Sequence, residues 1–112
     1  MMQTQEFDSL AALQEYLASE TAVLVYFSTP QCNVCKVLKP KVVSLLEQRY
    51  PQMGFVYSDV ARDAETAAQL GVLTVPTLIV YFDGKESARF VRTFGIGELE
   101  AAIARPYELL FG

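Results

Sequence analysis

The sequence predicts an α/β fold built on a mixed β-sheet, and three observations support this prediction. Strand-like and helix-like hydrophobic patterns alternate along the chain. Residues 22–27 form a continuous apolar run, which is typical of a strand covered on both faces. Asp83 and Gly84 separate two further strand-like segments. With 112 residues the chain has the size of one ordinary domain, so we expect a single domain over residues 1–112.

The first predicted element is a helix whose apolar residues Leu10, Leu13 and Leu17 recur at helical spacing. Asp8 or Ser9 can cap its start, and residues 19–21 close it. The apolar run 22–27 follows and is rich in β-branched and aromatic residues, so we expect it to be a central strand.

A long helix is predicted after the turn at residues 28–31. It begins near Cys32 and ends before Pro51, since proline interrupts a helix. Pro40 lies inside it and is expected to bend it. The apolar positions that mark one face of this helix are Leu38, Val42, Leu45 and Leu46.

Strand and helix then alternate a second time. Residues 55–60 are strand-like, and Asp63 can cap a short helix over residues 64–70 that stops at Gly71. Residues 77–82 and 87–93 flank the Asp83-Gly84 turn and predict a hairpin, because this dipeptide supplies the positive φ values of a tight turn. The strands of a hairpin are antiparallel, whereas strands linked by helices can run parallel, so we expect a mixed sheet.

The last predicted helix starts at about Gly97 or Glu98 and runs to Arg105. Pro106 is expected to break it or to restart a short turn. The apolar tail over residues 107–111 can pack on the edge of the sheet or form a dimer contact.

Composition and charge exclude several classes of protein. Hydrophobic residues make up 52% and charged residues 20% of the chain, which indicates a packed globule and excludes disorder. The net charge of −4 argues against nucleic-acid binding, which needs clustered Lys and Arg. The absence of histidine removes histidine-activated nucleophiles and histidine bases. Two cysteines are too few for a zinc site in one chain, so we expect neither a metal nor another cofactor.

The start of the chain lacks the basic and apolar regions of a secretory signal, so we expect a cytoplasmic protein. The longest apolar stretch, residues 72–82, is interrupted by polar residues and proline. It is much shorter than the roughly 20 residues that cross a bilayer. The sequence therefore predicts no membrane segment.

Cys32 and Cys35 are three residues apart at the junction between the predicted central strand and the long helix. Helical spacing of i and i+3 brings two thiols close enough to form a disulfide. Cys32 would lie at the helix N-terminus, where the dipole and free N–H groups stabilise a thiolate, so it is the expected nucleophile. Cys35 is less accessible and is the expected resolving thiol. The alternative is a pair of buried, inert cysteines.

Several further features occur in a fixed order along the chain: Cys32-Asn33-Val34-Cys35-Lys36 after a buried strand, Pro40, Thr74-Val75-Pro76-Thr77, the Asp83-Gly84 turn and Gly95 before the last helix. With these features the chain resembles the thioredoxin family across nearly its whole length. The resemblance implies the thioredoxin fold, with a central mixed sheet of four to five strands flanked by helices. It also implies a cis peptide at Val75-Pro76 beside the dithiol, and reduction of protein disulfides.

The expected substrate-binding residues lie beside the dithiol and in the Pro76 segment. If Pro76 lies beside Cys32, the backbone of Val75 can pair with an extended substrate without reading its sequence. The alternative for Pro76 is the simple start of a strand. The full set of these residues is Gln31, Asn33, Val34, Thr74, Val75 and Pro76.

The chain departs from the family at several positions. It contains no tryptophan, so the rim that faces substrate is altered. A buried Asp and a Lys that are typical of the family correspond here to Tyr26 and Tyr57, which can also be ordinary core residues. Asp59 is the nearest alternative acid, although it can equally be a solvated strand end. Lys36 could lower a thiolate pKa but is expected to face solvent.

The leading functional hypothesis is a cytoplasmic protein-disulfide reductase that contributes to cell redox homeostasis. Its partners would be disulfide-containing proteins, and the resemblance implies a flavin-containing, NADPH-dependent thioredoxin reductase as electron donor. The alternative is a thioredoxin-fold binding or redox-sensing module with little turnover. A glutaredoxin-type function is a third option, although no charge clamp for glutathione is recognisable in the sequence.

Overall fold

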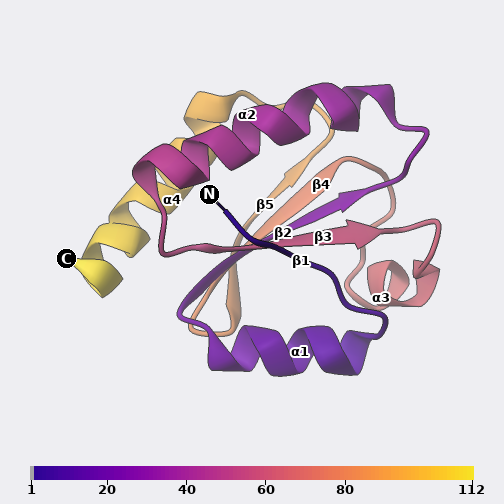
Figure 1. Cartoon of the computed structure of the whole chain (residues 1–112), viewed down its shortest axis with the longest axis horizontal. Helices are drawn as coiled ribbons and strands as arrows, with labels where there is room; N and C mark the ends of the chain where they lie inside the picture. Colours follow the sequence, from indigo (N-terminus) through magenta and orange to yellow (C-terminus); the bar gives the residue numbers. More distant parts are fainter. Residues whose placement is uncertain (1) are drawn as a thin grey trace.

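The computed structural model describes residues 2–112, and Met1, the first residue of the expected 1–112 domain, lies outside the described residues. Strands and helices alternate along most of the chain (Figure 1). In chain order the elements are β1 (Thr4–Gln5), α1 (Leu10–Ser19), β2 (Ala22–Ser28), α2 (Asn33–Arg49), β3 (Gly54–Asp59), α3 (Ala64–Gln69), β4 (Thr77–Phe82), β5 (Lys85–Val91) and α4 (Ile96–Phe111).

The five strands form one mixed sheet in the order β1-β3-β2-β4-β5. β1 and β2 both pair with β3 in parallel. β4 is antiparallel to both β2 and β5. The predicted mixed sheet is therefore confirmed, and β2 is its central strand as expected.

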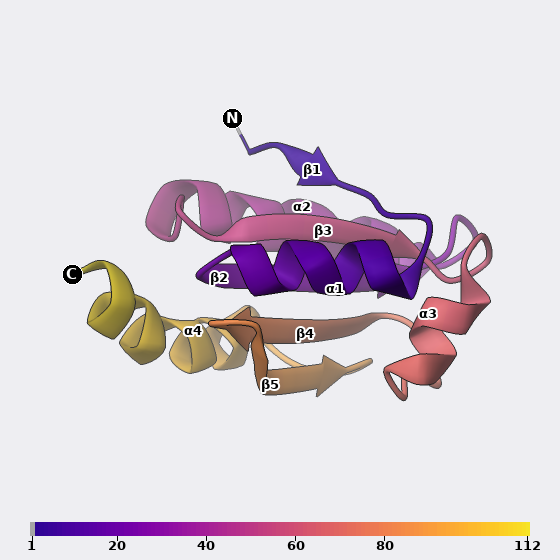
Figure 2. The same ribbon diagram turned by 90° about the horizontal axis from the view of Figure 1, so that it is seen from below.

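Each face of the sheet is covered by two helices. Figure 1 shows α2 and α4 on one face and α1 and α3 on the other, and Figure 2 shows α1 lying along the sheet. Successive residues of β2 point to opposite faces. Leu24 and Tyr26 therefore join the core under α2 and α4, and Val25 and Phe27 join the core over α1 and α3. All seven residues of β2 are buried.

The predicted helix caps and hairpin turn are present. Ser9, the second of the two proposed caps, accepts a hydrogen bond from the backbone N–H of Ala12 at 3.2 Å. Asp63 caps α3 through the N–H of Thr66, also at 3.2 Å. Asp83 and Gly84 have φ values of 53° and 77°, as the tight turn requires.

Strand boundaries differ from the predictions in four of the five strands. β2 runs one residue beyond the predicted segment 22–27, to Ser28. β1 is only two residues long and was not predicted, because so short a strand has no hydrophobic period. β3 begins one residue earlier than expected and ends at Asp59. β5 covers Lys85–Val91, whereas residues 87–93 were expected. The two-residue turn is the reason, since Phe82 pairs with Lys85 directly after it.

The prediction that the last helix breaks at Pro106 is wrong. α4 starts at Ile96 and continues through Pro106 to Phe111. The rings of Tyr107 and Tyr50 lie 5.0 Å apart, and the backbone N–H of Gln52 donates to the Tyr107 hydroxyl at 3.0 Å. Because these contacts form only if the helix continues, they offset the hydrogen bond that proline removes. The tail forms the end of α4, and its Tyr107 and Phe111 pack against the core cluster under α2 and α4.

α2 begins and ends as predicted, with Cys32 as its N-cap and Arg49 as its last residue. Pro40 lies inside it, and the bend expected there stays a prediction. Within residues 2–112, no helix combines the length and the apolar character that crossing a membrane requires.

Replacing Pro106 tests the continuity of α4. We expect Pro106→Ala to raise the free energy of unfolding by up to about 3 kcal/mol, because alanine restores a helical N–H donor. Urea denaturation gives this value, and Pro30→Ala in an exposed turn is the matched control with a smaller change. An unchanged midpoint in Pro106→Ala would show that α4 is not a continuous helix at this position.

Candidate functional site

Cys32 and Cys35 lie where β2 ends and α2 begins, and the structure joins them in a disulfide. Their Cα atoms are 5.2 Å apart, which is within the usual range for a disulfide. The Cys32 sulfur accepts a hydrogen bond from the Cys35 backbone N–H at 3.2 Å, so it caps the helix. The backbone N–H of Cys32 donates to the Thr29 carbonyl at 3.1 Å, which fixes the turn before the helix. The spacing argument from the sequence thus gave the correct local geometry.

The two sulfur-bearing side chains differ in access to solvent. Cys35 is 2% exposed and belongs to the core between the sheet and α2, whereas Cys32 is only partly buried. An incoming disulfide therefore reaches Cys32 first. This asymmetry is what an attacking and a resolving thiol require.

The Val75-Pro76 segment enters the sheet at the same end of the strands at which the chain leaves β2 toward Cys32. Phe27, near the end of β2, pairs with Thr77, the first residue of β4. The Val75-Pro76 peptide bond is cis, as the family resemblance implied. The Thr77 hydroxyl donates to the Thr74 carbonyl at 2.7 Å and holds the turn before β4. Strand pairing thus brings the segment to the end of the sheet that carries the dithiol.

The expected substrate-binding residues differ in exposure. Gln31 and Asn33 flank Cys32 and are exposed, and Val34 is 61% exposed. Thr74 and Val75 are half-buried, and Pro76 is buried. Val75 and Cys32 both pack against the core cluster under α2 and α4. A role in substrate binding stays a prediction for all six residues.

Tyr26 lies directly behind the dithiol. Its hydroxyl is buried and donates to the Cys35 backbone carbonyl at 2.7 Å, so it holds the backbone of Cys35 and not its sulfur. Burial, reinforced by nearby Tyr57, raises the pKa of Tyr26 well above its ordinary value. The Tyr57 ring stacks on Tyr26 with centroids 6.3 Å apart, and the Lys39 ammonium lies 4.6 Å above the Tyr57 ring. Two neutral aromatic residues and a cation therefore line the buried side of the site.

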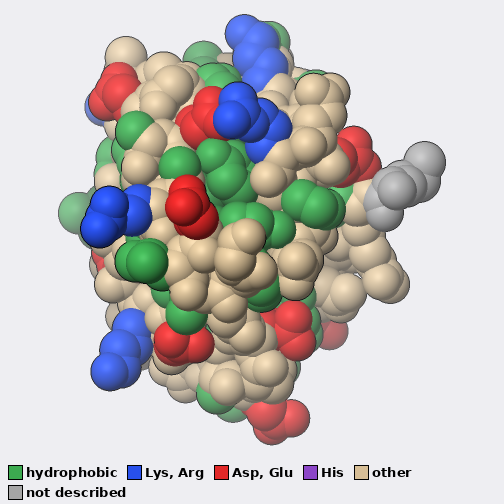
Figure 3. Space-filling model, turned by 90° about the vertical axis from the view of Figure 1, so that its left-hand side faces the viewer, with side chains coloured by type: hydrophobic (Ala, Val, Ile, Leu, Met, Phe, Trp, Pro, Cys, Tyr) green, Lys and Arg blue, Asp and Glu red, His purple; other side chains and the backbone are tan. Residues whose placement is uncertain are grey.

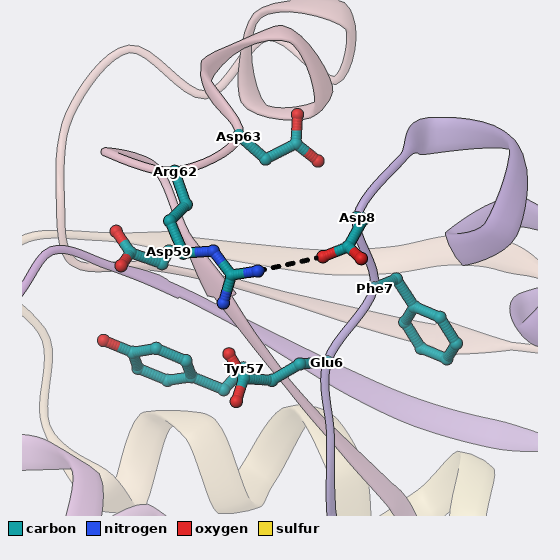
Figure 4. A pocket seen from close by; sticks show the side chains of 7 residues that line it. All are labelled: Glu6, Phe7, Asp8, Tyr57, Asp59, Arg62 and Asp63. Carbon is teal, nitrogen blue, oxygen red and sulfur yellow. Dashed lines mark hydrogen bonds and ion pairs between the residues drawn. The ribbon is translucent and has the colours of Figure 1, made fainter.

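Asp59 and Lys36 take the structural roles that the sequence left open for them. The Asp59 carboxylate accepts the backbone N–H of Ala61 at 2.9 Å, as at a strand end. Asp59 lines a pocket of about 240 Å³ in which Arg62 reaches Asp8 at 3.2 Å (Figure 4). That pocket contains neither cysteine. Lys36 is exposed, as expected.

A groove of about 490 Å³ begins beside the dithiol and was not predicted from the sequence. Its first wall is one face of α2, and its second wall is the loop between β5 and α4, which no sequence pattern connects to the cysteines. The lining residues are Asn33, Val34, Val37, Leu38, Lys41, Arg92, Thr93 and Phe94.

Comparisons with known proteins agree with this geometry. A family model described as Thioredoxin matches residues 2–105. The thioredoxin-like protein YdfQ of Bacillus subtilis is 30% identical over 104 residues, which cover 93% of this chain and 92% of that protein. Thioredoxin-1 of Saccharomyces cerevisiae is 31% identical over 86 residues, or 77% of this chain and 82% of the relative.

Solved structures give the same result for the fold. The thioredoxin of Fasciola hepatica superposes with a TM-score of 0.77 at 27% identity, and the match covers 88% of this chain and 95% of that one. A mutant thioredoxin from Halobacterium salinarum superposes with a TM-score of 0.79 at 26% identity, covering 90% and 88%.

The buried Tyr26 hydroxyl makes a prediction about alkaline stability. We expect Tyr26→Phe to lower the free energy of unfolding by about 1 kcal/mol at pH 7, because one buried hydrogen bond is lost. The raised pKa of folded Tyr26 means that its contribution is complete below pH 10, the ordinary pKa, and is lost as the pH rises above it. The difference between the two proteins should therefore narrow above pH 10.

Urea denaturation of both oxidised proteins at several pH values measures this difference. The other tyrosines are common to both proteins and cancel in it. A difference that stays constant from pH 7 to pH 11 would contradict the burial of the Tyr26 hydroxyl.

Proposed function

Since this chain belongs to the thioredoxin family, we propose that it is a thiol-disulfide oxidoreductase that reduces protein disulfides. The observation that carries the proposal is the Cys32–Cys35 pair, joined in a disulfide at the start of α2 with only Cys32 partly exposed. Such a pair can change between a dithiol and a disulfide by thiol-disulfide exchange.

The reaction proceeds in two exchanges. The Cys32 thiolate attacks one sulfur of the target disulfide, the target S–S bond breaks, and the leaving thiolate takes up a proton. The Cys35 thiolate then attacks the Cys32 sulfur and releases the second target thiolate, which is also protonated. Two electrons have passed from the dithiol to the target, and the Cys32–Cys35 disulfide remains.

We assign substrate binding to the end of the sheet that carries the dithiol. The backbone of Val75, next to Pro76, offers an extended target segment a strand to pair with. Thr74 extends this segment, and the exposed side chains that flank Cys32 form the rest of the contact surface, namely Gln31, Asn33 and Val34.

Tyr26 does not serve as the base for the second exchange. Its hydroxyl donates to the Cys35 carbonyl, and its pKa is raised, so it stays protonated near neutral pH. The Cys35 proton must therefore leave to water or to the departing thiolate. Because burial disfavours a thiolate, release of the target should accelerate in mildly alkaline solution.

The dithiol must be regenerated by an electron donor. We assign this role to a flavin-containing, NADPH-dependent thioredoxin reductase, on the basis of the family alone. In the more reducing half of a cytoplasmic range of roughly −220 to −320 mV, a pair with a thioredoxin-like potential of about −270 mV would exist mainly as the dithiol. The protein would then act as a reductant in cell redox homeostasis.

Catalytic turnover separates this function from a binding or sensing module of the same fold. With excess dithiothreitol as the reductant, we expect the protein to accelerate the reduction of insulin disulfides over many cycles. Cys32→Ser should abolish this acceleration, because no nucleophile remains. A wild-type rate equal to that of dithiothreitol alone would favour the binding module.

Trapping of mixed disulfides tests which sulfur attacks. We expect Cys35→Ser to accumulate a covalent complex with a disulfide-containing target through Cys32, because the second exchange is blocked. Cys32→Ser should not, since the remaining Cys35 is buried. Non-reducing electrophoresis and mass spectrometry measure the complexes, and equal trapping by the two variants would overturn the assignment.

A further inference from the structure

The groove beside the dithiol has an apolar floor that solvent reaches. Val34, Leu38 and Lys41 share one face of α2 with Val37, because residues three, four and seven apart lie on the same side of a helix. Val34 and Val37 are 61% and 63% exposed, which is high for valine. Phe94, half-buried, provides the opposite apolar wall.

The charged residues that line this groove are both basic. Lys41 and Arg92 are exposed, and neither forms an ion pair within the described residues 2–112. The charged residues of the groove are therefore positive, although the whole chain carries a net charge of −4. By contrast, the end of the molecule that carries the last turns of α4 shows acidic and basic side chains interspersed (Figure 3).

Arg92 is held in place by the segment that carries the cis peptide. Its backbone N–H donates to the Pro76 carbonyl at 2.9 Å, and the N–H of Thr93 donates to the Val91 carbonyl at 2.8 Å. Arg92 has a φ of 60°, in the left-handed region that residues with a side chain rarely adopt. These hydrogen bonds fix the backbone of Arg92, and so the start of its side chain, relative to Pro76.

We propose that this groove selects protein disulfides whose cysteine is flanked by an apolar residue and then by an acidic one. The inference rests on the proposed function, since the substrate disulfide must reach Cys32. The apolar residue contacts Val34, Val37 and Phe94. The carboxylate that follows it pairs with Lys41 or Arg92, which form no ion pair with an acidic residue among residues 2–112. The covalent chemistry is the two-step exchange described above, and the groove adds only selection.

The test uses three synthetic peptides of sequence X-Leu-Cys-Gly-Ser-Cys-Leu-X, with an intramolecular disulfide and X as Glu, Gln or Lys. An excess of dithiothreitol regenerates the protein dithiol, and chromatography of the reduced peptide gives kcat/KM. We expect the Glu peptide to exceed the Gln peptide roughly three- to tenfold at low salt, and the Lys peptide to be slowest. The preference should shrink in 0.5 M salt, because the Debye length is then only about 4 Å and exposed charges are screened.

Charge-removing variants locate the preference. In the double variant Lys41→Gln, Arg92→Gln the ratio of the Glu to the Gln peptide should fall close to one. Lys85→Gln is the control, because Lys85 is exposed and is the first residue of β5. It pairs with Phe82, at the other end of β4 from Thr77. The Lys85→Gln variant should keep the wild-type ratio.

Each other outcome overturns the inference in a recognisable way. Turnover of all three peptides at equal rates would reject the acidic preference and leave the proposed function intact. A preference that persists in the double variant would place the selection elsewhere. Fast reduction of glutathione disulfide with no preference among the peptides would make a small anionic disulfide the occupant. No turnover of any peptide or of insulin would reject the proposed function itself.

Discussion

The burial of β2 on both faces is the constraint on which the rest of the structure depends. Six of its seven residues belong to the two core clusters that the helices cover, three in each, and its neighbours β3 and β4 pair along nearly its whole length. The strand cannot shift by one residue without turning every apolar side chain to the wrong core. The position of its last residue, Ser28, therefore fixes where α2 starts, and with it the two cysteines.

The same constraint explains how a site can be built without a carboxylate behind it. Tyr26 is the last apolar residue of β2 on the α2 side, and its hydroxyl donates a hydrogen bond to the Cys35 carbonyl. A buried carboxylate there would have to be paired at a cost, whereas the stacked rings of Tyr26 and Tyr57 need no counter-charge. The buried side of the site thus serves stability, and the charges that can act on a target lie on its outer side.

Most of the fold and the dithiol could be predicted because they depend on local signals. The helix caps Ser9 and Asp63, the Asp83-Gly84 turn and the apolar run of β2 each lie in a few consecutive residues. The continuation of α4 through Pro106 could not be predicted, because it depends on contacts with Tyr50, which lies far away in the sequence. The groove is missed for the same reason, since Arg92 meets α2 only after the sheet has formed.

A redox titration of the dithiol tests the central claim most directly. The protein is equilibrated with glutathione or dithiothreitol buffers of known potential, and free thiols are alkylated and counted by mass spectrometry. The account predicts one two-electron transition with both thiols appearing together, a slope of about 30 mV per tenfold change, and a midpoint between roughly −220 and −320 mV. Thiols that appear one at a time, or a pair that stays in one state across this range, would contradict it.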